Sequence, residues 1–100
     1  MKKKVAILTQ KNSLSNDLQD NTNINIFDME EDKVVEYENI KIEEKEYNQF
    51  SSLLSKKKIN LLYLNTITNE FKNILEKLGI IVKVKDEFSD DKFIDQFIFD

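Results

Sequence analysis

The sequence predicts one three-layer α/β domain, whose mixed five-stranded sheet combines an antiparallel hairpin with a parallel β-α-β unit. Two observations lead to this fold class. Residues 59–84 have the pattern of a strand, a short loop, a helix and a second strand. Residues 24–42 have the pattern of two strands that are separated by a polar turn. Since 100 residues is a common size for one domain, we treat residues 1–100 as a single domain.

The β-α-β unit begins with residues 59–64, a nearly continuous apolar run that is typical of a strand covered on both faces. Thr68 or Asn69 can cap the helix that follows, because their side-chain oxygens accept its first free N–H groups. One apolar stripe of that helix is formed by Phe71, Ile74, Leu75 and Leu78. Gly79 is the only glycine in the chain and suits a left-handed helix end. Residues 80–84 are largely β-branched, and a helical crossover makes this strand parallel to the first.

The other strands are predicted from shorter patterns. Residues 5–9 form a small apolar strand. We expect this strand and strands 59–64 and 80–84 to be mutually parallel and to lie in the centre of the sheet. Residues 24–29 and 34–42 form the hairpin. Its acidic turn, Glu30-Glu31-Asp32, is interpreted as a solvated tip, because a calcium loop would contain a glycine.

Residues 11–23 are rich in Asn, Ser and Asp, and they predict a long loop with a helical turn at residues 15–18. We interpret this segment as a solvent-exposed connection between strands, and a functional loop is the alternative interpretation.

Two further helices are predicted. The first opens at residues 43–46, where carboxylates suit the positive end of the helix dipole. It ends in lysines 56–58, which we interpret as dipole compensation, with an anion site as the alternative. The last helix begins at Ser89, and its start explains part of the carboxylate cluster at residues 86–91, for which a metal site is the alternative. Phe99 widens the apolar stripe of this helix and is a candidate contact for a partner.

Composition excludes several classes of function. The chain has no cysteine and no histidine, which removes thiol chemistry, the commonest general base and the commonest metal ligands. A formal charge of −4 argues against binding to nucleic acid. The apolar run at residues 5–8 is too short for a signal peptide or a membrane helix, so we expect a cytoplasmic protein. We expect no enzymatic activity, since only carboxylate or lysine chemistry would remain.

The order of these elements, together with five short motifs, resembles the dinitrogenase iron–molybdenum cofactor-binding family, over nearly the whole chain. That resemblance implies a ribonuclease H-like fold. The matching motifs are Lys4-Val5-Ala6-Ile7, the hairpin Ile26-Phe27-Asp28 with Lys33-Val34-Val35-Glu36, Leu64-Asn65-Thr66-Ile67-Thr68, Leu78-Gly79-Ile80 and Ser89-Asp90-Asp91. The corresponding family patterns are K-V-A-I, I-Y-D with K-V-V-E, V-G-G-I-G, A-G-I and T-x-E-E.

The chain departs from the family where the family binds its cofactor. The family loop V-S-x-H-F-G-R-A aligns with residues 14–21, in which Ser15 is kept. Asp17 replaces the histidine, Gln19 the glycine and Asp20 the arginine, while Asn65 and Thr66 replace the paired glycines. Because iron–sulfur clusters require thiolate or imidazole ligands, we expect no cofactor and no metal site.

The sequence therefore predicts a non-catalytic domain, similar to this family, that acts through an unknown protein partner or an unknown small ligand. It predicts no nucleic acid, no membrane and a possible homo-oligomer. A carrier of an iron–sulfur or iron–molybdenum cluster is the alternative. A ribonuclease H-like nuclease would need a carboxylate on strand 5–9, which has none.

Ligands of open α/β sheets bind beyond the carboxyl ends of the parallel strands. The residues expected at that rim, suited to a small neutral or cationic group, are Thr9, Gln10, Ser15, Asp17, Asn65, Thr66, Thr68 and Asn69.

Overall fold

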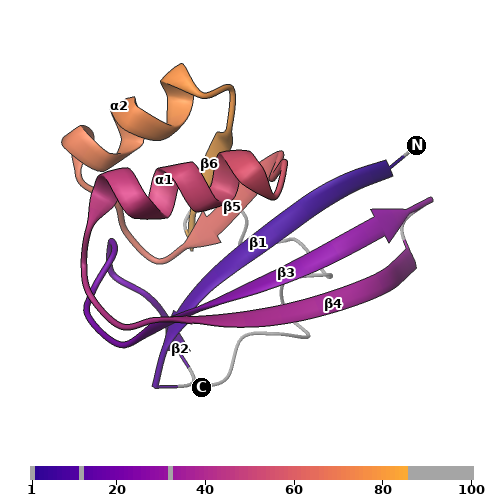
Figure 1. Cartoon of the computed structure of the whole chain (residues 1–100), viewed down its shortest axis with the longest axis horizontal. Helices are drawn as coiled ribbons and strands as arrows, with labels where there is room; N and C mark the ends of the chain where they lie inside the picture. Colours follow the sequence, from indigo (N-terminus) through magenta and orange to yellow (C-terminus); the bar gives the residue numbers. More distant parts are fainter. Residues whose placement is uncertain (1, 12, 32, 86–100) are drawn as a thin grey trace.

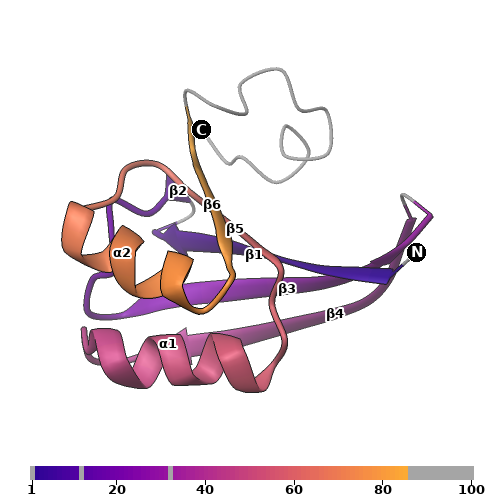
Figure 2. The same ribbon diagram turned by 90° about the horizontal axis from the view of Figure 1, so that it is seen from above.

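The computed structural model describes residues 2–11, 13–31 and 33–85 and shows a twisted sheet with two helices (Figure 1; Figure 2 shows the same ribbon from above). Along the chain the elements are β1 (Lys2–Gln10), β2 (Ser13–Leu14), β3 (Thr22–Glu30), β4 (Lys33–Ile42), α1 (Tyr47–Lys56), β5 (Leu61–Leu64), α2 (Asn69–Lys77) and β6 (Ile81–Val84). Among these described residues, no helix has the length and apolarity needed to cross a membrane.

The sheet has the order β4-β3-β1-β5-β6, with β2 paired to the end of β1. Strands β1, β5 and β6 are parallel, whereas β3 is antiparallel to both β1 and β4. This arrangement confirms the predicted mixed α/β class and agrees with the ribonuclease H-like motif.

Two details of the predicted sheet are wrong. The described part of the sheet has six strands, because residues 13–14 turn back and pair with Thr9 and Gln10. The parallel strand β6 lies at the edge of the described sheet, whereas we predicted that it would be central. A short strand after the last crossover joins the sheet outside β5, because β3 already occupies the other side of β1.

Residues on both faces of the sheet are buried. Ala6 and Leu8 of β1 pack in one cluster with residues of both helices, including Phe50, Leu54 and Phe71. The opposite face holds a second buried cluster, which consists of Val5, Ile7, Phe27, Met29 and Tyr63. Burial on both faces is what a three-layer domain requires. The helix predicted from Ser89, the carboxylates at residues 86–91 and Phe99 lie outside the described residues.

The hairpin is confirmed. β3 and β4 pair antiparallel along their length, with a β-bulge where the register shifts between Asp28 and Met29. Val35 and Tyr37 are exposed, whereas Ile40 and Ile42 pack against the core on the helix side.

Helix α1 begins later than predicted. Its N-cap is Glu46, whose carboxylate accepts from the Asn48 backbone N–H (3.1 Å), and no acidic residue lies in its first turn. Glu43 and Glu44 precede the helix because their segment is held by the loop after β2. The Asn21 N–H donates to the Glu43 carbonyl (3.1 Å), which keeps that segment out of the helix. Lys56 lies in the last turn, as predicted from the helix dipole.

Helix α2 has the predicted caps at both ends. Thr68 is the N-cap, and its hydroxyl accepts from the Phe71 N–H at 3.3 Å. At the C-terminus, the Ile80 N–H donates to the Leu75 carbonyl (3.1 Å) and the Gly79 N–H donates to the Glu76 carbonyl (3.0 Å). This bonding is a Schellman motif, and Gly79 has the left-handed φ of 79° that the motif needs.

We expect Gly79→Ala to lower the free energy of unfolding by about 1 kcal/mol. An added Cβ would have no heavy atom within 4 Å, so the left-handed backbone alone causes the loss. Urea denaturation measures it, and Gly79→Asn is the control, because asparagine tolerates this conformation and should lose less. An unchanged or raised midpoint for Gly79→Ala would contradict the assignment.

Candidate functional site

The loop between β2 and β3 lies against the loop that follows β5. The Asn65 N–H donates to the Ser15 carbonyl and the Asp17 N–H donates to the Thr66 carbonyl, each at 2.8 Å. Asn16 and Thr66 form an isolated parallel bridge. The helical turn predicted at residues 15–18 is therefore wrong, because the main chain of Ser15, Asn16 and Asp17 pairs with the loop after β5 instead. The predicted approach of this loop to the strand-end rim is confirmed.

We call this contact between residues 15–17 and residues 65–66 the junction. The side chain of Asn16 adds hydrogen bonds to it. Its Oδ1 accepts from the Asn65 Nδ2 (2.6 Å) and the Thr66 hydroxyl (3.2 Å). Beneath it, the buried Ser15 hydroxyl donates to the Asp17 carbonyl at 2.6 Å. Residues about fifty positions apart in the sequence thus bond through both main chain and side chains.

Asp17 is the centre of the site. Its side chain is 8% exposed, and its backbone has a left-handed φ of 60°. Oδ1 accepts from the Thr68 N–H (2.9 Å) and the Thr68 hydroxyl (3.1 Å). Oδ2 accepts from the Tyr47 hydroxyl, and the Lys45 Nζ lies 3.8 Å away. One carboxylate therefore joins the loop after β2 to the first residues of both helices.

The surroundings of Asp17 keep its carboxyl ionised. Burial by itself raises the pKa of Asp17, because desolvation disfavours the charged form. Four hydrogen bonds to the carboxylate outweigh this desolvation and lower the pKa of Asp17 below the usual 3.8. Their donors are the Thr68 N–H, the Tyr47 hydroxyl, the Leu18 N–H and the Thr68 hydroxyl. At neutral pH the group therefore has no proton to donate, and its oxygens are already occupied by protein donors. A general acid or base would need a pKa nearer the working pH.

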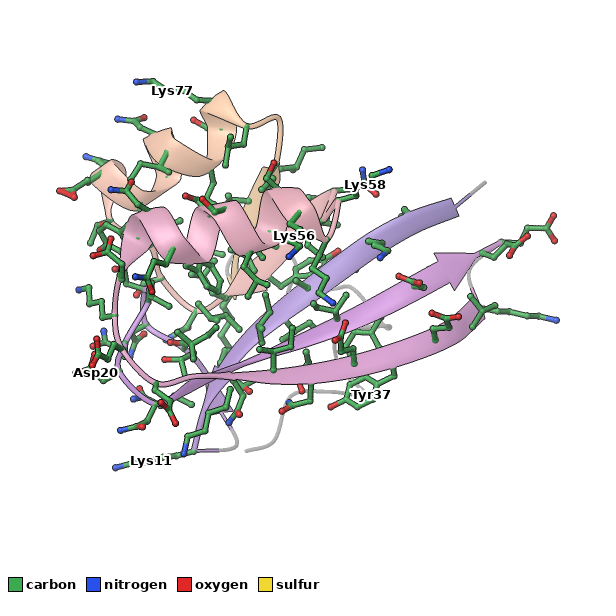
Figure 3. The ribbon with its side chains drawn as sticks, viewed as in Figure 1. Lys11, Asp20, Tyr37, Lys56, Lys58 and Lys77 are labelled. Carbon is green, nitrogen blue, oxygen red and sulfur yellow. The ribbon has the colours of Figure 1, made fainter. Side chains whose placement is uncertain are left out.

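Two hydrogen bonds at Asp20 connect the outer part of the same loop to Lys45 and to Gln10. The Lys45 backbone N–H donates to Asp20 Oδ1 at 2.6 Å, and Gln10 Nε2 donates to the Asp20 carbonyl at 3.1 Å. Asp20 is labelled in Figure 3, at the side of the molecule where this loop lies. Asp17 and Asp20 thus both accept hydrogen bonds from the chain itself.

Thr9 belongs to a different network. Its hydroxyl accepts from Asn25 Nδ2 (3.0 Å), and Asn25 Oδ1 accepts from the Tyr37 hydroxyl (2.8 Å) and from Asn39 Nδ2 (2.7 Å). These side chains form a row across β1, β3 and β4. They can meet because alternate residues of a strand point to the same face of the sheet, whereas neighbouring residues point to opposite faces. The structure therefore gathers Gln10, Ser15, Asp17, Asn65, Thr66 and Thr68 into one junction and leaves Thr9 out. Asn69 is exposed at the first turn of α2.

Four residues of the junction were not predicted as site residues: Asn16, Asp20, Lys45 and Tyr47. The ring of Tyr47 packs against the core, where it stacks on Phe71 with centroids 4.7 Å apart. Its hydroxyl reaches Asp17 across 30 residues of sequence. No local pattern signals this contact, since it depends on how α1 and the loop pack.

The residues present do not fit an iron–sulfur or iron–molybdenum cluster. The chain has no thiolate and no imidazole to bind soft metal ions. Within the described ranges, no three carboxylates gather in a way that could hold a metal ion. Lys45 offsets part of the charge of Asp17, so the missing soft ligands are the stronger obstacle.

The fold and the site together define a mixed α/β domain whose strand-end loops are tied to each other. No protein-family model matches the chain, and no curated protein matches it. Among solved structures, the chain is similar to the crystal structure of PH0822, with a TM-score of 0.74. The match covers 95% of this chain and 91% of that chain, at 18% sequence identity. At that identity the similarity shows the fold alone.

Proposed function

We propose that this chain is a non-catalytic, cytoplasmic binding domain that acts by contact with a partner protein. In this proposal it is a diverged relative of the dinitrogenase iron–molybdenum cofactor-binding family and does not bind the family's cofactor. The observation that carries the proposal is the bonding of Asp17. At the position of the family's histidine, the chain has a buried carboxylate whose two oxygens accept from Thr68 and Tyr47.

The same bonding disfavours an open small-ligand site at the rim. Asn65, Thr66 and Thr68, which we expected to face a ligand, bond instead to Asn16 and Asp17. A small ligand would have to break these bonds before it could form its own, and each broken bond leaves a polar group unpaired. A partner that docks on the outer surface has no such cost, so the rigid junction supports protein contact better.

The test is anaerobic reconstitution. We expect that, after purified protein is mixed with extracted iron–molybdenum cofactor, its peak on a sizing column contains neither molybdenum nor iron in stoichiometric amounts. The physical reason is that carboxylates prefer hard ions and do not replace thiolate or imidazole. Metal analysis of each fraction gives the result.

A matched variant makes the test sharper. It carries Asp17→His and Asp20→Arg, the residue types of the family pattern. Metal in the variant's peak but not in the wild-type peak would assign the lost binding to these two positions. Stoichiometric metal in the wild-type peak would overturn the proposal in favour of the cluster carrier.

A further inference from the structure

The strand β4 forms one edge of the sheet, as Figure 1 shows. In the described part of the chain, β3 alone pairs with it, so one row of its N–H and C=O groups faces away from the sheet. The register with β3 is regular from Glu36 to Ile42, beyond the bulge near the hairpin tip. Residues 36–42 of β4 therefore form a regularly paired edge that can accept another strand.

A groove of about 460 Å³ lies where the chain passes from β4 into α1. Ile42 contributes to it from β4, and Phe50 and Leu53 contribute from α1. A strand added to the edge would direct every second side chain toward the helix layer, because side chains alternate between the faces of a sheet. Those side chains would reach the apolar part of this groove. A groove between an edge strand and a helix is the geometry by which several domains bind an extended peptide.

The charge around the groove indicates the chemistry of the occupant. Glu43, Glu44 and Glu46 line it, opposed by one cation, Lys41. Glu43 and Glu44 are exposed, so their carboxylates can meet a cation with little desolvation cost. A basic segment fits this rim. A second copy of the chain would fit it poorly, since β4 itself has no net charge and the chain carries −4.

We propose that the edge of β4 and the adjoining groove bind an extended basic segment of a partner protein, which adds to the sheet as a strand. Apolar side chains of that segment enter between Ile42, Phe50 and Leu53, and lysine or arginine side chains pair with Glu43 and Glu44. This site gives a location and a ligand class to the partner contact of the proposed function, on which it rests.

The probe is a synthetic peptide of alternating lysine and valine, equal in length to the ten-residue β4. Titrated into the ¹⁵N-labelled full-length chain, it should shift the amide signals of residues 36–44 and of Gln49, Phe50 and Leu53. Amides on the free edge of β4 should also become slower to exchange with solvent, because they gain acceptors.

Three controls separate strand addition from plain charge attraction. A peptide methylated on every backbone nitrogen keeps the charge but cannot donate, and it should lose binding. A peptide of alternating glutamate and valine should not bind. The double variant Glu43→Lys with Glu44→Lys should raise the Kd for the lysine peptide roughly tenfold. The matched variant Glu31→Lys with Glu76→Lys changes the net charge equally at two exposed positions outside the groove, and it should bind nearly as the wild type.

Three results would overturn the inference. The first is that the methylated and unmethylated peptides bind equally well, and the second is that the two double variants bind the lysine peptide equally well. The third is that the β4 amide shifts depend on protein concentration alone, which would assign the edge to a second copy of the chain. None of these results affects the proposed lack of cofactor binding, because metal reconstitution tests that separately.

Discussion

Replacing Asp17 with alanine is expected to lower the free energy of unfolding by about 3 kcal/mol. The change removes the acceptor for the Thr68 N–H, the Thr68 hydroxyl and the Tyr47 hydroxyl in a nearly closed space. It also places an alanine at a φ of 60°, which a residue without a short polar side chain adopts at a cost. Chemical denaturation followed by circular dichroism measures the loss.

Two variants at the same position separate these causes. Asp17→Asn keeps the shape and the tolerance of a left-handed backbone but loses the charge, so it should lose less than alanine. Asp17→Gly removes the side chain and relieves the backbone, so its loss reports the missing hydrogen bonds. A glycine variant as stable as the wild type would show that the junction contributes no stability.

The free energy of unfolding should depend on pH through the ionisation of Asp17. The pKa of Asp17 is lowered on folding, so its ionisation stabilises the fold above the usual pKa of 3.8. That stabilisation is lost as the pH falls from there through the lower pKa of the folded state. The stability difference between wild type and Asp17→Asn should therefore be constant near neutral pH and shrink below about pH 4. A difference that grows on acidification would contradict the assignment.

The second large effect is expected at Phe71, the residue that joins the junction to the core. Its side chain is fully buried, stacks on Tyr47 and lies tilted against Phe50 with centroids 5.6 Å apart. Phe71→Ala should cost about 4 kcal/mol, because it loses the apolar contacts of the ring and leaves a cavity between the two helices. Urea denaturation at neutral pH measures this cost.

Controls for this prediction come from the same helix and from its aromatic neighbour. Phe71→Leu fills much of the cavity and should cost about 1.5 kcal/mol. Asn73→Ala lies on the exposed side of α2 and should change stability by no more than about 0.5 kcal/mol. Tyr47→Phe keeps the ring stack and removes the hydroxyl that donates to Asp17 and lies 3.3 Å from the Thr68 hydroxyl. If Phe71→Ala cost no more than Asn73→Ala, the two helices would not be joined through this cluster.

The elements that depend on local patterns of residues could be predicted from the sequence alone. The apolar runs of β1 and β5 identify buried strands, since only a strand covered on both faces gains from continuous apolar residues. The stripe from Phe71 to Leu75 and the following Gly79 identify α2 and its end. The hairpin follows from alternation in β4, where exposed Val35 and Tyr37 contrast with the packed Ile40 and Ile42.

Features that depend on residues far apart in the sequence could not be predicted, because they arise from the way the elements pack. The start of α1 moved to Tyr47 because the loop after β2 bonds the preceding segment. Lys58 takes a left-handed φ of 59° at the end of α1 without being glycine, because Ile59 must turn into the core. Asp17 was predicted as a residue open to a ligand, and it became the acceptor of Thr68 and Tyr47, which lie 51 and 30 residues away. A buried carboxylate takes whichever donors the fold brings to it, and only the packing of both helices against the sheet brings these.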